Sequence, residues 1–156
     1  MANQMKAKDS VSGSLAECYI TINGDRYNFM QLYNFEATFD VNVSEIPILG
    51  RTMRGHKATY CSGSWSGTAH YNQSIFRKVW LEYKRTGDMP YFDIQVTNED
   101  PTSSIGRQTI ILKECLSEGG PLAKYDADAE YLDEELSGTF DDWEMPETFK
   151  VLEGMQ

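Results

Sequence analysis

Nine residues, from Phe35 to Val43, alternate strictly between apolar and polar side chains. A period of two places the apolar side chains on one face of a β-strand and the polar ones on the other face. Such a strand is typical of an antiparallel sheet that is packed on one side and wet on the other. The pattern therefore predicts a mainly β fold in which Phe35, Ala37, Phe39, Val41 and Val43 form a buried face.

Other segments carry the same kind of signal. Strand patterns cover residues 17–22, 25–30, 91–97 and 107–116, and one or two acidic strands are expected around Gly138 between Tyr125 and Trp143, with a tail from Pro146. Asn23-Gly24 predicts a tight hairpin because both residues tolerate a positive φ. Residues 50–57 are predicted to form a loop. In all, we expect about seven or eight strands.

One helix is predicted, from an N-cap at Ser74 to a stop at Gly87 and Pro90. Its apolar stripe has helical spacing and consists of Ile75, Phe76, Val79, Trp80 and Tyr83. We therefore expect an antiparallel β-sandwich or barrel with one flanking α-helix.

The chain has 156 residues, of which 40% are hydrophobic, and this fits one compact domain. We expect a mobile N-terminal arm at residues 1–12 and a single β domain at residues 13–156. The polar start has no apolar core of a secretory signal, and no run approaches the length of a membrane span, so no membrane anchor is expected.

Charge is distributed unevenly along the chain. Residues 1–113 hold 12 Lys and Arg and 11 Asp and Glu, whereas residues 114–156 hold 2 and 13. The formal net charge of −10 argues against stable nucleic-acid binding, which needs a basic face.

Two charged clusters are candidates for contacts between copies of the chain. The expected inter-subunit contact residues are Gly50, Arg51, Met53, Arg54, Gly55, His56 and Lys57. The candidates for an acidic surface are Asp126, Asp128, Glu130, Glu134, Glu135, Asp141 and Asp142. Association of unlike patches is heterologous and gives rings or open filaments.

Catalytic and metal-binding patterns are weak. His56 and His70 have no metal-ligand spacing with Cys, Asp or Glu, and no nucleophile elbow, phosphate loop or dinucleotide fingerprint occurs. A Cys61/His56 pair reads as a chance juxtaposition. The alternating carboxylates from Asp126 to Glu130 lack the glycine and terminal Glu of an EF-hand loop. We therefore expect no catalytic residues, no metal and no cofactor. The cysteines are odd in number, and we expect all three, Cys18, Cys61 and Cys115, to be reduced thiols.

Two other functions stay open at this point. The first is a soluble monomeric β-sandwich that binds carbohydrate or peptide through exposed Tyr60, Trp65 and Tyr71. The second is a hydrolase that uses His56 or His70 with carboxylates.

Across residues 10–150 the chain resembles the tail tube proteins of PBSX-type contractile phage tails, which are similar to those of tail-like bacteriocins. The segments that carry the resemblance are Phe35-x-Ala37, Gly50-Arg51-x-Met53-x-Gly55-His56-Lys57, Gly63, Gly67-Thr68-Ala69, Pro90-Tyr91-Phe92, Leu132-x-Glu134-Glu135 and Phe140-Asp141-Asp142-Trp143-x-x-Pro146-Glu147.

The resemblance implies a structural protein without catalytic residues. Six subunits would form a ring, and rings would stack into the inner tube of a phage tail or tail-like particle assembled in the bacterial cytoplasm. The implied partners are further copies of the chain, the sheath, the baseplate and the tail terminator. A tape measure protein or DNA would occupy the negatively charged channel transiently, and the acidic candidates given above would line this channel.

Overall fold

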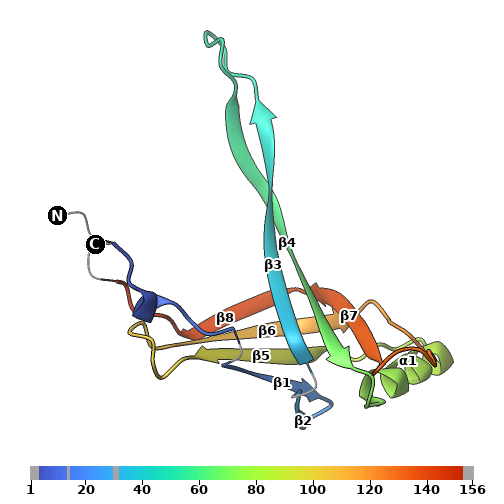
Figure 1. Ribbon diagram of the computed structural model, residues 1–156. Coiled ribbons are helices and arrows are strands. Elements are labelled where there is room, and N and C mark those ends of the chain that lie inside the picture. Colours follow the sequence, from blue (N-terminus) through green and yellow to red (C-terminus); the bar gives the residue numbers. More distant parts are fainter. Residues whose placement is uncertain (1–3, 14, 30–31, 153–156) are drawn as a thin grey trace.

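The computed structural model describes residues 4–13, 15–29 and 32–152. It contains eight strands and one α-helix within those ranges, in a compact body from which one long hairpin projects (Figure 1). No helix in the described part of the chain is long and apolar enough to cross a membrane. The prediction of a mainly β antiparallel fold with one flanking helix is confirmed.

Two antiparallel sheets form the molecule, and one strand belongs to both. The first sheet has the order β2-β1-β5-β6-β8, and the second has the order β6-β7-β4-β3. The strands are β1 (Ala16–Ile22), β2 (Asp25–Asn28), β3 (Leu32–Ile46), β4 (Gly55–His70), β5 (Phe92–Glu99), β6 (Arg107–Ser117), β7 (Asp133–Phe140) and β8 (Asp142–Glu147). Glu114 adopts a φ of 54° close to the point where β6 leaves the first sheet for the second. β6 is therefore the corner of the sandwich.

The hairpin predicted at Asn23-Gly24 is confirmed. β1 and β2 pair up to Ile22 and Asp25, which leaves a two-residue turn with φ angles of 52° and 85°. The return strand ends at Asn28, and Phe29 continues the pairing by donating its backbone N–H to the Cys18 carbonyl. Met30, the predicted end of this strand, lies outside the described residues.

Helix α1 (Ile75–Thr86) connects the two sheets by joining β4 to β5. Its buried side chains, Phe76 and Trp80, pack with Trp65 and Phe92 in the centre of the core. Gly87 ends the helix in the left-handed conformation, with a φ of 77°, as predicted. Ser74 occupies the N-cap position without a side-chain cap.

The helix start is instead held by the preceding residue. The Gln73 Oε1 atom accepts the Ile75 N–H at 2.7 Å. The Gln73 amide therefore caps the start of the helix, a role that we predicted for the Ser74 hydroxyl.

The β3–β4 hairpin is longer than predicted. β3 runs to Ile46 and β4 starts at Gly55, so the loop is confined to residues 47–54 and Gly55, His56 and Lys57 belong to a strand. The reason is that polar and charged residues continue a strand without difficulty when it faces solvent on both sides. The expected loop over residues 50–57 is therefore wrong at its C-terminal end, where β4 has already begun.

The acidic end of the chain forms β7 and β8. Residues 125–132 are not in a strand, and Gly138 lies inside β7. Pro146 belongs to β8 instead of starting a tail. The described pairing of β8 is with β6 alone, and an edge strand tolerates the missing N–H of proline.

The N-terminal segment contacts the loop after β5. A 3-10 turn at Ala7–Asp9 lies beside residues 100–104, where the Ser104 N–H donates to the Lys8 carbonyl at 3.1 Å. The Ser12 N–H donates to Asp100 Oδ2 at 3.1 Å.

Candidate assembly surfaces

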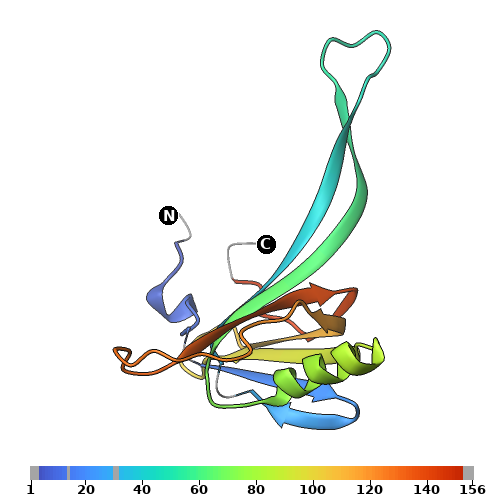
Figure 2. The same ribbon diagram turned by 90° about the vertical axis from the view of Figure 1, so that its right-hand side faces the viewer.

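The projecting part of the β3–β4 hairpin, residues 40–62, is called the hairpin arm here. Within the described residues its strands pair only with each other, because β7 pairs with β4 from Gly63 onward. Figure 2 shows the arm extending well beyond the two sheets of the body. It therefore lacks the second layer that would cover one of its faces.

One face of the hairpin is apolar. Cross-strand partners share a face, and the register pairs Phe39 with Gly63, Val41 with Cys61 and Val43 with Ala58. Toward the body this face continues into Trp65, which stacks on Phe35 inside the core. The apolar stripe thus starts in the core and runs out along the arm.

The predicted burial of the alternating face is wrong for most of its length: Phe35 is half-buried, whereas Ala37 and the three residues of this face beyond it are exposed. Phe39, Val41 and Val43 are 49%, 49% and 56% exposed. Phe39 touches the Trp143 ring of β8, whereas about half of each valine side chain faces solvent. The alternation identifies an amphipathic strand correctly, but it does not say which molecule covers its apolar face.

Exposed apolar and cationic side chains share the tip of the arm. Gly50 has a φ of 83° in a turn closed by the Arg51 N–H and the Ile48 carbonyl. Leu49 and Met53 are 102% and 74% exposed. The tip therefore offers both charge and apolar area to a partner.

The basic cluster predicted here is brought together only in part. Arg54 and His56 each lie 4.0 Å from the Glu45 carboxylate. Arg51 and Lys57 have no ion pair within the described part of the chain. Gly55 packs tightly, since a side chain there would meet Ile48 Cδ1 at 2.7 Å.

The acidic candidates fall into three places. Asp126, Asp128 and Glu130 are exposed in the loop between β6 and β7. Asp141 is exposed between β7 and β8, and Asp142 is exposed at the start of β8. Glu135 is exposed on β7. The Asp128 N–H donates to Asp126 Oδ1 at 3.1 Å, so this carboxylate shapes its own loop. No group of three potential metal ligands occurs among the described residues.

Glu134 corrects the prediction of an acidic surface at that position. It is 1% exposed and forms an ion pair with Arg77 of α1. Its Oε1 also accepts the Gln73 Nε2–H at 2.8 Å, and Arg77 lies 4.2 Å from the centre of the Tyr71 ring. This carboxylate joins β7 to the start of the helix, because a buried charge must be paired and hydrogen-bonded.

The residues of the alternative functions are scattered. Trp65 is buried, Tyr71 packs on Arg77, and only Tyr60, at 67% exposure, is free to stack on a ligand. Cys61 and His56 are five residues apart on β4, about 16 Å along an extended strand. Neither a sugar-binding platform nor a Cys–His dyad is assembled.

His70 has partners that the sequence did not predict. Its Nδ1 lies 3.8 Å from Asp133 Oδ1, and the Tyr33 hydroxyl donates to the other oxygen of Asp133 at 2.8 Å. That hydrogen bond to a carboxylate raises the pKa of Tyr33. The three side chains come from strands far apart in sequence, so no local motif marks them.

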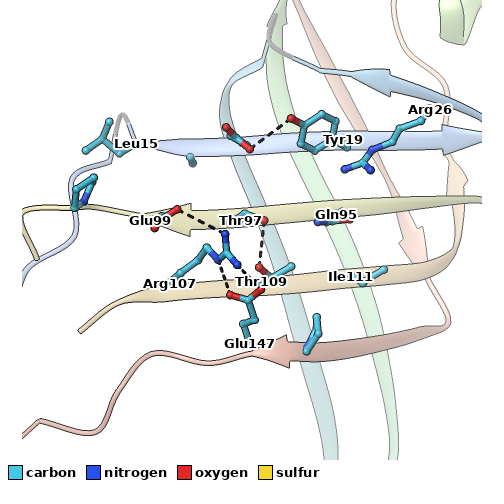
Figure 3. Close-up of a pocket in the computed structure, with 14 residues that line it drawn as sticks. Leu15, Tyr19, Arg26, Gln95, Thr97, Glu99, Arg107, Thr109, Ile111 and Glu147 are labelled. Carbon is cyan, nitrogen blue, oxygen red and sulfur yellow. Dashed lines mark hydrogen bonds and ion pairs between the residues drawn. The ribbon is translucent and has the colours of Figure 1, made fainter. Parts of the chain in front are cut away.

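A groove of 530 Å³ lies on the outer face of the first sheet (Figure 3). Its charged groups neutralise one another: Arg107 contacts Glu99 at 3.8 Å and Glu147 at 2.7 Å. The guanidinium lowers the pKa of Glu147, and the carboxylate raises that of Arg107. Arg26 lies over the Tyr19 ring at 4.1 Å. Sequence reasoning missed this groove because its residues come from five strands and the adjoining loops.

Comparison with known proteins agrees with these features. Residues 3–147 match a family model described as "Phage tail tube protein". The chain is 32% identical over 143 residues to the phage-like element PBSX protein XkdM of Bacillus subtilis, and covers 95% of that protein. It is also 32% identical over 146 residues to the uncharacterized protein YqbM of the same organism, and covers 97% of it.

A solved structure supports the fold. A chain in the anti-feeding prophage baseplate superimposes with a TM-score of 0.63 at 14% identity, with 93% of this chain and 97% of that chain covered. The resemblance expected from the sequence is thereby confirmed. The chain belongs to the phage tail tube protein family, and it is a structural subunit of the tail of a phage or tail-like particle and not an enzyme.

Proposed function

We propose that six copies of the chain form a ring, that rings stack into the inner tube of a contractile tail, and that the hairpin arm makes the contacts between copies. One observation carries this proposal. The apolar face of the arm continues the core of the body but has no covering layer of its own. A contiguous exposed apolar surface marks a protein interface.

Charge suggests which surfaces meet. The tip carries Arg51 and Arg54, whereas the β6–β7 loop carries Asp126, Asp128 and Glu130. In Figure 2 the tip and this loop lie on opposite sides of the molecule. Two copies joined tip to loop therefore leave one tip and one loop free, and such a heterologous contact repeats into a ring or a stack.

The other expected partners follow from the family. The sheath, baseplate and tail terminator would contact the tube wall and its ends. A tape measure protein or DNA would occupy the channel, and a subunit with a net charge of −10 repels phosphate groups instead of binding them.

Reversing the charge of the tip tests the contact. We expect Arg51→Glu with Arg54→Glu to give a folded chain with an unchanged melting temperature and at least a tenfold lower yield of tubes. The measurement is negative-stain electron microscopy with light scattering over a range of concentrations. The matched control is Lys78→Glu with Lys84→Glu, two exposed cations of α1 that make the same change in net charge.

A charge swap sharpens the result. Adding Asp126→Lys and Asp128→Lys to the tip variant should restore tubes, because the opposite charges then face each other again. A normal tube yield from the tip variant alone would show that the tip is not an inter-subunit contact.

A further inference from the structure

The ladder of the β3–β4 hairpin is interrupted within the hairpin arm. Asn42 pairs with Tyr60, but the next residue of β3, Val43, pairs with Ala58. Thr59 is therefore an extra residue in β4, and it forms a β-bulge. A bulge bends the strand that carries it and increases the local right-handed twist. The part of the arm beyond Thr59 consequently takes a direction that the bulge sets, and Figure 2 shows the arm curving, with its strands crossing below the tip.

The apolar side chains of the arm explain the position of the extra residue. Without a bulge, the ladder would pair Val43 with Thr59 and would set Ala58 on the polar face. With the bulge, Val43 and Ala58 share a face, as Val41 and Cys61 do nearer the body. The register of a strand follows the hydrophobic pattern in this way. The extra residue therefore keeps the apolar face of the arm continuous toward the tip.

Side-chain hydrogen bonds hold the bulge. Asn42 Nδ2 donates to Thr59 Oγ1 at 2.7 Å, and Thr59 Oγ1 donates to the Asn42 carbonyl at 3.2 Å. The Thr59 hydroxyl thus acts as both acceptor and donor toward one residue of the opposite strand. These two bonds tie the extra residue to β3, so the bulge gives the arm a defined bend.

A second bulge, at the base of the hairpin, acts differently. There Tyr33 is an extra residue of β3, and its hydroxyl donates to Asp133 of β7 at 2.8 Å. The base bulge therefore directs a side chain toward the body. The Thr59 hydroxyl instead bonds back to the opposite strand of the arm, so its bulge acts on the course of the arm itself.

Contact between copies, as proposed above, requires the tip to reach a second copy in one orientation. We infer that Thr59 is a positioning residue for assembly, because its bulge gives the outer arm the bend that brings the tip onto the second copy. The inference rests on the proposed function and adds the residue that aims the contact. Thr59 acts through tip residues such as Leu49 and Arg51.

Deletion of Thr59 tests the bend selectively. Every pair of the arm's ladder can form without this residue, and the tip residues and the net charge stay the same, so we expect a folded chain with an unchanged melting temperature. Pulsed electron paramagnetic resonance measures the bend in the unassembled chain, with spin labels at Leu49→Cys in the tip and Asp25→Cys in the β1–β2 turn, in a Cys61→Ala background. We expect the deletion to shift the distance between the labels. Thr59→Ser, which keeps the extra residue and its hydroxyl, should leave that distance unchanged.

The yield of tubes measures the consequence for assembly. We expect the deletion to lower this yield at least tenfold in negative-stain electron microscopy, and Thr59→Ser to keep the wild-type yield. Thr59→Val, which keeps the extra residue but loses both hydrogen bonds, should lie between the two. A role in folding alone would lower the melting temperature together with the yield, whereas positioning lowers the yield at constant melting temperature.

The outcomes separate this inference from the proposed function. An unchanged distance between the labels after the deletion would overturn the role of Thr59 and leave the tube intact. A normal tube yield from the deletion variant, while the Arg51→Glu with Arg54→Glu variant loses tubes, would do the same. A wild-type chain that forms no ring or tube, alone or with the other tail proteins, would overturn the proposed function itself.

Discussion

The body and the hairpin arm are built from the same kind of amphipathic strand, but their apolar faces differ in burial. In the body, apolar side chains such as Ile94 and Leu112 are 0% and 2% exposed because helix α1 and the facing sheet cover them. In the arm, Val41 and Val43 remain about half exposed on an identical pattern. The difference shows that amphipathic alternation specifies a face to be covered, and that only the tertiary arrangement decides whether the cover is intramolecular.

The largest expected effect is on the free energy of unfolding, when one phenylalanine ring is removed from the body and, for comparison, one from the arm. Phe76→Ala deletes a ring that is 1% exposed and contacts Phe29, Trp65, Trp80 and Phe92, so we expect a loss of about 3–5 kcal/mol in the free energy of unfolding. Phe39→Ala removes a half-exposed ring and should cost about 1 kcal/mol. Urea unfolding of the unassembled chain measures both values.

For the yield of assembled tubes, we expect the two variants to rank in the opposite order. At a temperature where both variants are folded, Phe39→Ala should reduce tube yield more than Phe76→Ala does. Equal losses of stability for the two variants, or a Phe39→Ala variant that assembles normally, would remove the distinction between body and arm.

The three cysteines report on the same contrast through their reactivity. Burial raises the pKa of Cys18 and of Cys115 to about 12, whereas Cys61 is exposed on the apolar face of the arm. Only a thiolate reacts quickly, so the folded unassembled chain should titrate one thiol with Ellman's reagent near pH 8, and the denatured chain should titrate three. In tubes the Cys61 thiol should be protected at least tenfold.

The position of the reactive thiol is checked with Cys61→Ala. That variant should show no fast-reacting thiol in its folded, unassembled form. Full reactivity of Cys61 in tubes would mean that this part of the arm stays uncovered.

The smallest effect is expected on the outer face of the first sheet. The Arg107 guanidinium holds the pKa of Glu147 below its ordinary value of 4.5. A lowered carboxyl pKa stabilises the fold above the ordinary value, and this stabilisation disappears as pH falls through the folded-state value. Glu147→Gln should therefore be slightly less stable than wild type at pH 7, and the difference should vanish well below pH 4.

Thermal unfolding at several pH values measures that difference. Because the pair is exposed, salt should reduce it as well. A pH-independent difference would mean that packing of the Glu147 side chain, and not its charge, is responsible.

Much of the fold could be predicted from local patterns. The Asn23-Gly24 turn, the stripe of α1 and the strand at residues 92–97 are each defined by neighbours in sequence, and all three are present. The left-handed φ of Gly87 follows in the same way from the absence of a side chain. These features depend on a few residues and the geometry of the backbone.

The remaining features depend on residues distant in sequence. Glu134 lies in a run of three acidic residues, and only the packing of α1 against β7 selects it for burial beside Arg77. The exposed valines of the arm and the groove around Arg107 likewise depend on which elements lie side by side. The polar rows that β3, β4 and β7 share, such as Thr38–Ser64–Thr139, emerge only when the registers of these strands are known.

The opposite placement of the cationic tip and the acidic β6–β7 loop has a consequence for any stack joined in this way. Such a polymer has polarity: one terminus exposes a layer of unused arms, and the other exposes a layer of unused acidic loops. The two ends of the polymer therefore differ in shape and in the sign of their charge. A single capping protein cannot fit both, so initiation and termination require two chemically distinct factors, and growth proceeds with a defined direction.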